Sequence, residues 1–326
     1  MTAARLLRGP HNANGKIEPN RKPMSLLDLI HWVGGFVPSR IRRLDIFRRP
    51  YERAVIGRNF ERAFGHPPDL KAPTTFSEKI IYKMMFDRRP ILTRITDKLR
   101  AREYVAERIG ARYLTKLYQV CRSPAEIDWP TLPRRFVIKA THGTGMNIFV
   151  RDKSEIDVPA VSARLETWLT QNLYHRHREW AYRDVPPAIL IEEMLTEDSG
   201  ALAANWKFFT FDGRAEFLRV DLDWHGRPAI NNYDRDLTRL HLRGRYQPNA
   251  ITDPKFPANI ELMFSLADRL GSGLDFVRVD LYNVNGRIVF GELTSYPAAG
   301  LDPFYPAEFD AVFGNKWRLP ARYEKS

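Results

Sequence analysis

The chain has 326 residues, of which 44% are hydrophobic and 12% aromatic, and its formal net charge is +12. This composition fits about two folded domains and excludes a disordered, collagen-like or coiled-coil chain. The single cysteine, Cys121, excludes an internal disulfide and a zinc site built from several cysteines, so we expect a reducing compartment.

The first sixty residues carry most of the excess charge. They hold twelve Lys and Arg against four Asp and Glu, and twelve minus four gives +8. Residues 1–20 lack the apolar core of a secretory signal, so we expect no export and a cytoplasmic protein. Residues 26–37 (LLDLIHWVGGFV) are too short and too polar to span a bilayer, which takes about 20 apolar residues.

Two interpretations of residues 26–37 stay open. Their apolar residues recur at helical spacing and a basic run follows, which is typical of a helix lying on an anionic membrane surface. The alternative is a helix packed on the main domain with a solvated basic face. We do not expect nucleic acid as a partner, because no recognisable binding motif accompanies the charge.

From Pro67 onward the composition becomes even, and helix signals follow. Thr74, Thr75 and Ser77 can cap a helix over residues 78–86. A second helix is predicted over residues 97–109, with Gly110 at its C-terminal end.

The segment 135–150 (RFVIKATHGTGMNIFV) predicts a strand that ends in Lys139, a polar loop, and a returning strand. Backbone N–H groups of such a loop can close over phosphates. The order of a Walker A motif is missing and no helix follows. An ordinary hairpin is the alternative. The loop residues are His142, Gly143, Thr144 and Gly145.

A second segment, 188–198, reads as a buried strand that ends in acidic residues. Glu192 and Glu193 follow the apolar residues 188–191. Backbone groups from Glu193 to Leu195 could bind a purine edge, and Glu197 or Asp198 could accept hydrogen bonds from ribose hydroxyls. The alternative is a solvated strand end.

The segment 275–297 predicts two strands joined at Asn285-Gly286, a strong hairpin signal. A two-residue turn would place Asp280 opposite Gly291 and direct Glu292 to the other face. A three-residue loop would place Arg278 opposite Glu292.

We predict the three-residue loop, because it brings the polar residues of both strands to one face. Asp280 and Glu292 would then be diagonal neighbours about 7 Å apart, a spacing that suits divalent cations on nucleotide phosphates. Alternating polar residues on a solvent face are the alternative. The residues on the shared face are Arg278, Asp280, Glu292 and Thr294.

Together with Asp97-Lys98, which opens a predicted helix, these segments resemble the ATP-grasp superfamily over residues of about 75 to 305. A narrower resemblance is to the TupA-like ATP-grasp family. That family is associated with teichuronopeptide synthesis and bacterial polysaccharide gene clusters, and its members are often labelled glycosyltransferases. The matching segments are 75–79 (TFSEK), 97–98 (DK), 136–143 (FVIKATHG), 206–213 (WKFFTFDG) and 291–294 (GELT).

The resemblance implies an α+β ATP-grasp fold, in which two α/β lobes with antiparallel sheets clamp ATP. We expect a basic N-terminal appendage over residues 1–73 and an ATP-grasp domain over 74–310. Lobe 1 would span about 95–190 and lobe 2 about 191–305, and residues 311–326 would form a tail.

The resemblance also implies ATP and Mg²⁺ as cofactors. Asp280, Glu292 and Thr294 would hold Mg²⁺, and Arg278 would offer its guanidinium to the developing acyl phosphate. Related ligases usually have asparagine where this chain has Thr294, so a second metal ion is expected to be held more weakly or through water. The expected ATP-binding residues are Lys98, Lys139, His142, Gly143, Thr144, Gly145, Glu192, Glu193, Leu195, Asp198 and Lys207.

The implied reaction is ATP-dependent ligation of a carboxylate to an amine through an acyl phosphate. The acceptors would belong to a cell-surface polymer or its precursor, at the inner face of the cell membrane. Two other functions stay open. Asp221-Leu222-Asp223 matches the Asp-x-Asp pattern of nucleotide-sugar transferases, which would make the protein a glycosyltransferase or sugar kinase. The other is a non-catalytic nucleotide-binding scaffold at the membrane.

Overall fold

The computed structural model describes residues 45–196, 203–224, 227–245, 247–321 and 323. Residues 1–55 and 56–326 form separate units, and the description below concerns the second. The segment 26–37 and Asp198 lie outside the described residues, so neither prediction about them is tested. Among the described residues, no helix has the length and apolar character needed to cross a membrane.

The helices begin where the sequence supplies caps. The Thr75 hydroxyl accepts a hydrogen bond from the Glu78 backbone N–H, and the Glu78 carboxylate accepts from the N–H of Thr75, which is a complete capping box. The predicted helices after Thr75 and Asp97 are therefore confirmed. The helices are α2 (Asp45–Phe64), α3 (Phe76–Phe86), α4 (Pro90–Thr96), α5 (Lys98–Arg108), α6 (Val158–Leu169), α7 (Tyr174–His177), α8 (Ile260–Gly271) and α9 (Glu308–Lys316).

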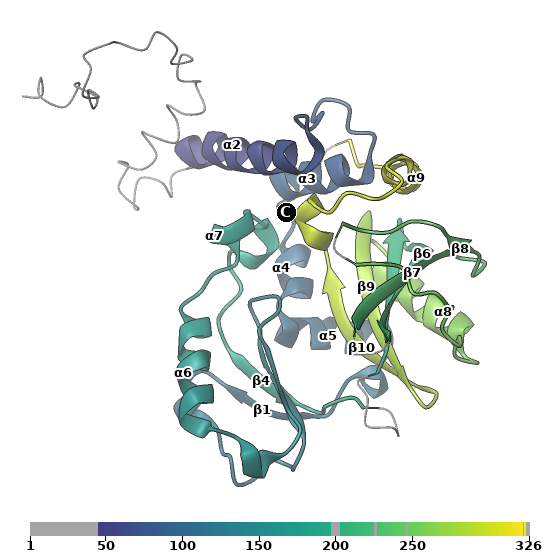
Figure 1. Cartoon of the computed structure of the whole chain (residues 1–326). Coiled ribbons are helices and arrows are strands. Elements are labelled where there is room, and N and C mark those ends of the chain that lie inside the picture. The colour runs from purple at the N-terminus through teal and green to yellow at the C-terminus, as the bar shows by residue number, and fades with distance from the viewer. Residues whose placement is uncertain (1–44, 197–202, 225–226, 246, 322, 324–326) are drawn as a thin grey trace, which may run out of the picture. The chain divides into compact units, whose positions relative to one another are not determined.

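Two antiparallel sheets form the body of the unit (Figure 1). The four-stranded sheet has the order β1-β4-β2-β3 and the six-stranded sheet the order β10-β9-β5-β6-β7-β8. We call the first sheet with α6 lobe 1, and the second with α8 lobe 2. The strands are β1 (Leu117–Cys121), β2 (Phe136–Ala140), β3 (Asn147–Val150), β4 (Ile189–Glu192), β5 (Asn205–Phe211), β6 (Arg214–Trp224), β7 (Arg227–Asp234), β8 (Arg239–Leu240), β9 (Phe276–Val284) and β10 (Arg287–Thr294).

Helix α6 packs on one face of the four-stranded sheet, and helix α8 packs on one face of the six-stranded sheet. Trp168 of α6 packs in the core of lobe 1, and Phe264 of α8 packs edge-to-face on Phe208 of β5 in lobe 2. Tyr104 of α5 belongs to the lobe 2 core, where its hydroxyl donates to the Leu270 carbonyl. The helix that starts at Lys98 is therefore fixed to lobe 2.

A third, aromatic core joins α3, α9 and the end of α2 to lobe 2. Phe76, Phe276 and Trp317 pack within ring-centroid distances of 4.6 to 5.9 Å. Ile56 and Phe60 of α2 are buried in the same cluster. The folded unit therefore uses apolar side chains from residue 56 onward.

The β9–β10 hairpin corrects the predicted register. Asn285 and Gly286 have φ values of 51° and 86°, so the turn has two residues and is of the primed type. The predicted three-residue loop is wrong. From Arg287 to Phe290 the strands pair as a two-residue turn requires, and then the register shifts by one residue. The shift is a β-bulge at Gly291, which an isolated glycine within a strand can indicate.

A two-residue turn alone would direct Glu292 away from the face that carries Asp280, but the bulge returns it to that face. Beyond the bulge, Glu292 pairs directly with Asp280, and Thr294 pairs with Arg278. Residues that are directly opposite project to the same face of a sheet. The predicted shared face of the four polar residues is therefore present, although a different backbone arrangement creates it.

Candidate active site

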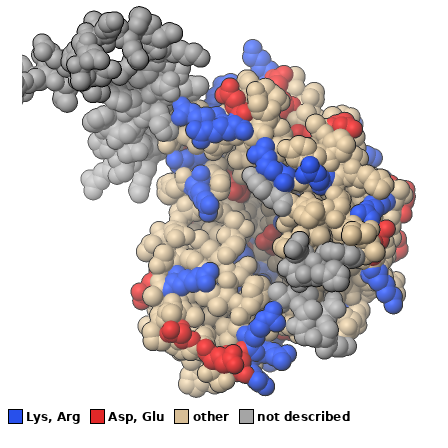
Figure 2. Space-filling model, viewed as in Figure 1, with Lys and Arg blue, Asp and Glu red and all other residues tan. Residues whose placement is uncertain are grey.

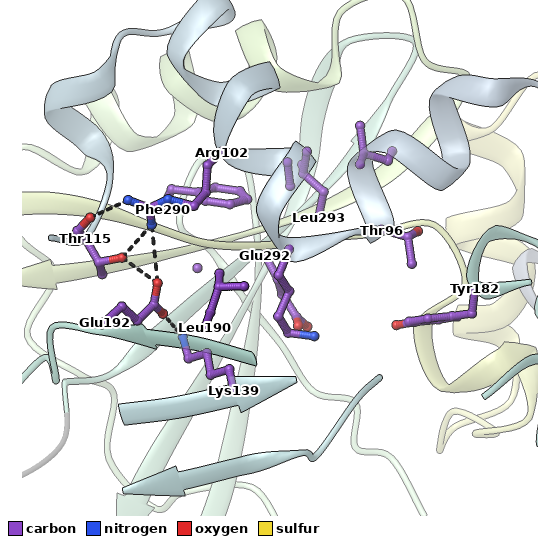
Figure 3. A pocket seen from close by; sticks show the side chains of 14 residues that line it. Thr96, Arg102, Thr115, Lys139, Tyr182, Leu190, Glu192, Phe290, Glu292 and Leu293 are labelled. Carbon is purple, nitrogen blue, oxygen red and sulfur yellow. Dashed lines mark hydrogen bonds and ion pairs between the residues drawn. The ribbon is translucent and has the colours of Figure 1, made fainter. Parts of the chain in front are cut away.

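Lobe 1 brings together two of the predicted residues, Lys139 at the end of β2 and Glu192 at the end of β4. The Lys139 ammonium pairs with one oxygen of the Glu192 carboxylate. The other oxygen accepts from the Thr115 hydroxyl at 2.8 Å and from Arg102 at 3.3 Å (Figure 3). Glu192 is a buried carboxylate, and Thr115 and Arg102 hold the oxygen that does not contact Lys139. Glu192 is thus fixed in place and orients Lys139.

Helix α5 directs Lys98 into the same space. The Asp97 side chain caps the helix by accepting from the Leu99 N–H at 2.9 Å. The Lys98 ammonium donates to the carbonyl of Gly143, in the loop between β2 and β3. Burial lowers the pKa of Lys98, and Glu292 partly offsets this effect. Lys98 therefore connects the lobe 2 helix to the predicted phosphate loop.

The loop between β2 and β3 is anchored at its start. The Thr141 hydroxyl donates to the Pro186 carbonyl and accepts from the Ala188 N–H, both at 3.0 Å. His142 is buried, and its Nε2 bonds the Trp168 carbonyl at the end of α6 at 2.9 Å. Burial lowers the pKa of His142. The side chain of His142 thus points into lobe 1, which leaves only its backbone for a nucleotide, whereas Thr144 and Gly145 line the cavity.

Lobe 2 contributes a cluster of four polar residues from β9 and β10. Arg278 donates to both oxygens of Asp280, at 2.7 and 2.8 Å. It also donates to Glu292 at 2.8 Å and to the Thr294 hydroxyl at 3.0 Å. Asp280 is buried, whereas the Glu292 side chain is 40% exposed. Arg278 therefore contacts all three predicted metal ligands at once.

The two carboxylates of this cluster differ in their electrostatics. Burial raises the pKa of Asp280, and the attraction of Arg278 and Lys207 only partly opposes it. Burial also acts on Glu292, but the charges of Arg278 and Lys98 outweigh it and lower the pKa. Glu292 is therefore ionised at neutral pH and, of the two carboxylates, is the more available to a metal ion.

The donor set fits Mg²⁺. Carboxylate and hydroxyl oxygens are hard ligands, and Mg²⁺ in nucleotide sites takes one or two carboxylates and completes its shell with phosphates and water. Asp280, Glu292 and Thr294 meet this description. No group of three or more His, Cys, Asp and Glu suited to a metal ion occurs in the described part of the chain. The site thus depends on the phosphates for its remaining ligands.

Lys207 and Glu193 make contacts that the sequence did not predict. Lys207 on β5 is opposite Asp280, but its ammonium is 2.5 Å from Asp221 on β6. Glu193 pairs with Arg287 of β10 at 2.6 and 2.9 Å, which links the two lobes. Its backbone N–H already donates to the Lys116 carbonyl at 2.9 Å.

A cavity of about 620 Å³ lies between the two sheets, within the range of about 300–1,000 Å³ typical of small-molecule sites. Leu195 lines it, together with Lys98, Lys139 and Glu292. A smaller pocket that shares Lys98, Lys139 and Glu292 adds apolar walls from Leu190 and Phe290. Figure 2 shows a recess in the visible face, with acidic and basic side chains at its edges.

Three residues that line the candidate site were not predicted from the sequence. Arg102 lies one helical turn after Lys98, a spacing that could have placed both on one face of α5. Thr115 and Tyr182 gave no signal, because Thr115 lies in an irregular connection and Tyr182 in the short 3₁₀ helix Trp180–Tyr182. The Tyr182 hydroxyl points toward Glu292 across the smaller pocket (Figure 3).

A comparison with protein families assigns most of this unit to one of them. The family model described as TupA-like ATPgrasp matches residues 78–318. No curated protein matches the chain.

Several solved structures match with low identity. D-alanine–D-alanine ligase from Bacillus anthracis is 16% identical, with a TM-score of 0.34, over 62% of this chain and 56% of that chain. The ATP-grasp ligase PsnB with its minimal precursor is 10% identical, with a TM-score of 0.33, over 63% and 53%. Carboxyaminoimidazole ribonucleotide synthase from Aspergillus clavatus with ATP is 12% identical, with a TM-score of 0.35, over 62% and 45%. The matched part is therefore about half of each of these chains.

Proposed function

The chain belongs to the TupA-like ATP-grasp family, and from this premise we propose that it is an ATP-dependent ligase that joins a carboxylate to an amine through an acyl phosphate. One observation carries the proposal. Arg278, Asp280, Glu292 and Thr294 form one hydrogen-bonded group on lobe 2, and Glu292 shares a cavity with Lys98 and Lys139. Oxygen ligands for a metal and cations for phosphates are thus brought together from both lobes.

The chain's own residues supply positioning and charge in this proposal. ATP with Mg²⁺, when bound, supplies the phosphoryl group. Lys98 and Lys139 bind phosphate oxygens, and the backbone N–H groups of the loop 142–146 close over them. Asp280, Glu292 and Thr294 hold the metal ion. These assignments agree with the contacts above, in which each cation is already oriented by a neighbouring acceptor.

Arg278 is the residue assigned to the reacting group. A guanidinium offers two parallel donors, which match a carboxylate or an acyl phosphate better than a lysine ammonium does. The attraction of Asp280 and Glu292 outweighs burial and raises the pKa of Arg278, so it stays charged throughout the reaction. Preorganised charge of this kind is the largest contribution in many phosphoryl and acyl transfers.

We further propose that the acid is a uronic acid or a glutamate of a bacterial cell-surface polysaccharide or teichuronopeptide-like polymer. The only support for this substrate class is membership of the TupA-like family. The glycosyltransferase alternative is less well supported, because Asp221 of its Asp-x-Asp pattern is paired with Arg219.

The test uses hydroxylamine, which traps an acyl phosphate as a hydroxamate. The purified full chain is incubated with ATP, Mg²⁺, hydroxylamine and, in turn, glucuronate, galacturonate and L-glutamate. Formation of ADP and hydroxamate in equal amounts with one acid is the expected result. Release of UDP from a UDP-sugar without ADP formation would favour the glycosyltransferase. Binding of ATP without turnover under any condition would favour a scaffold.

We also propose a peripheral location at an anionic membrane surface, which rests on the charge of +8 in residues 1–60. The test removes residues 1–44, because Ile56 and Phe60 are needed in the core. The truncated protein is expected to lose sedimentation with phosphatidylglycerol vesicles while it still binds ATP. Equal sedimentation of the two proteins would contradict the proposal.

A further inference from the structure

The polar face of lobe 2 continues beyond the proposed magnesium site. Four residues on neighbouring strands are directly opposite one another, in the order Glu292 on β10, Asp280 on β9, Lys207 on β5 and Arg219 on β6. Because directly paired residues project to one face of a sheet, this row of charges points toward the cavity side. Asp221 follows two residues after Arg219 and therefore shares this face.

Asp221 is the part of this extension that reaches the cavity. It lines the large cavity beside Asn205 and Tyr282, and its side chain is 28% exposed. One carboxylate oxygen is 2.5 Å from the Lys207 ammonium, and the other accepts from Arg219 Nε at 2.7 Å. Arg219 is in turn held by the side-chain oxygen of Gln247. Burial acts on Asp221, but Arg219 and Lys207 outweigh it and lower the pKa, so Asp221 is a carboxylate at neutral pH.

Lys207 lies between two carboxylates, Asp280 and Asp221. Its strand partner is Asp280, at the proposed metal site, whereas its ammonium contacts Asp221. The resemblance to the TupA-like ATP-grasp family places Lys207 among the residues that bind ATP. A lysine ammonium is a point charge on a flexible stem, so it can change acceptors. When it turns to a phosphate, Asp221 keeps Arg219 but loses its second cation, next to the cavity.

We propose that Asp221, oriented by Arg219, binds the amine substrate as its ammonium form, in the place that Lys207 leaves when it binds the ATP phosphates. The inference rests on the proposed ligase function and deepens it. It assigns a primary amine that is cationic at neutral pH to the β6 side of the cavity. The carboxylate substrate then binds on the Arg278 side of the cavity. Each substrate therefore has a protein group of opposite charge.

The first experiment compares two kinds of amine in the wild type and in Asp221→Asn, with the acid that gives hydroxamate. Hydroxylamine is uncharged at neutral pH, whereas ethanolamine, glucosamine, L-alanine and L-lysine carry an ammonium group. The expected result is a loss of kcat/KM at least tenfold larger for the cationic amine that reacts best than for hydroxylamine. Equal losses for both kinds would overturn the inference, as would failure of all four cationic amines in a wild type that makes hydroxamate.

Glu216→Gln is the matched control. Glu216 is on the same strand, but its carboxylate pairs with Arg214 at 3.3 Å and Lys316 at 3.0 Å, and it does not line the cavity. This variant is expected to retain the amine preference of the wild type. A change of preference equal to that of Asp221→Asn would show a general effect of lost negative charge and would overturn the inference.

A second measurement needs neither acid nor amine. Calorimetric titration with the non-hydrolysable analogue AMPPNP and Mg²⁺ is expected to give a several-fold lower Kd for Asp221→Asn, because Lys207 no longer has to leave a carboxylate. Unchanged or weaker binding would overturn the exchange of Lys207. If the wild type makes no hydroxamate, the ligase proposal fails, while this titration still decides whether Lys207 moves between Asp221 and the nucleotide.

Discussion

Asp280 and Glu292 face each other on adjacent strands because the chain inserts one extra residue, Gly291, between Phe290 and Glu292. A Cβ atom at Gly291 would lie 2.9 Å from the Tyr282 ring and 3.0 Å from the Asp280 carbonyl oxygen. Both contacts are closer than real Cβ atoms allow without movement. The bulge that aligns the two carboxylates thus depends on a residue without a side chain.

Gly291→Ala is therefore expected to displace Asp280 and Glu292, the proposed metal ligands. The added methyl group should cost about 1–3 kcal/mol of unfolding free energy, as overpacking does. Misplacement of a site by about 1 Å can cost about 100-fold in rate, so we expect at least tenfold slower ADP formation. Urea unfolding and an ADP assay at several Mg²⁺ concentrations measure the two effects. Gly57→Ala is the control, because a Cβ atom at Gly57 would have no other atom within 4 Å. If Gly291→Ala forms ADP as fast as this control does, the proposed role of the bulge is contradicted.

Glu292→Gln is expected to lower ADP formation by about 100-fold or more, because it removes the charge of a proposed metal ligand. The fold should remain, since the glutamine carbonyl can still accept the hydrogen bonds of Arg278 and Thr294. An ADP assay and the thermal unfolding midpoint distinguish these effects. Glu308→Gln, at an exposed helix start, controls for the change in net charge. ADP release at the wild-type rate from Glu292→Gln would remove it from the site.

Patterns that are local in the sequence predicted the structure well, and patterns that depend on distant packing did not. The helix cap near Thr75 and the strand that contains Lys139 need only neighbouring residues, and both are present. The predicted hairpin register is wrong because the pairing depends on a bulge at Gly291, which the turn signal at Asn285-Gly286 does not reveal. The salt bridge between Lys207 and Asp221 could not be foreseen, because it depends on which strands become neighbours.

Lys83 and Asp275 provide a test of the core outside the site. The Lys83 ammonium is fully buried, 2.6 Å from Asp275 and 3.0 Å from Asp87. Asp275 also accepts from Trp317 at 3.1 Å and so holds the end of the chain. Lys83→Met would leave two buried carboxylates with one cation fewer, and removal of one partner of a buried pair typically costs about 3–5 kcal/mol.

Urea unfolding at pH 7 measures this loss. Lys71→Met, at an exposed lysine, is the control and is expected to change the unfolding free energy by less than about 0.5 kcal/mol. A difference between the two variants below about 1 kcal/mol would mean that packing of the introduced methionine side chain replaces the ion pairs, as apolar residues replace some buried salt bridges.

Glu179, a buried residue outside the candidate site, is expected to make the free energy of unfolding depend on pH. The residue is 7% exposed, and its carboxyl group has no hydrogen bond or ion pair among the described residues. Burial raises the pKa of Glu179 to about 8, from an ordinary value of 4.5. The folded protein therefore keeps this proton up to about pH 8, whereas the unfolded chain releases it above about pH 4.5. Because the unfolded state binds fewer protons in this window, stability falls as the pH rises.

Glu179→Gln removes the titrating group and keeps nearly the same shape. The free energy of unfolding of the wild type, relative to this variant, is expected to fall by roughly 2 kcal/mol between about pH 6 and about pH 8, since one pKa unit corresponds to about 1.4 kcal/mol. Urea unfolding of both proteins at the two pH values measures the change. Parallel pH profiles would show that Glu179 is ionised in the folded protein and that a cation balances it there.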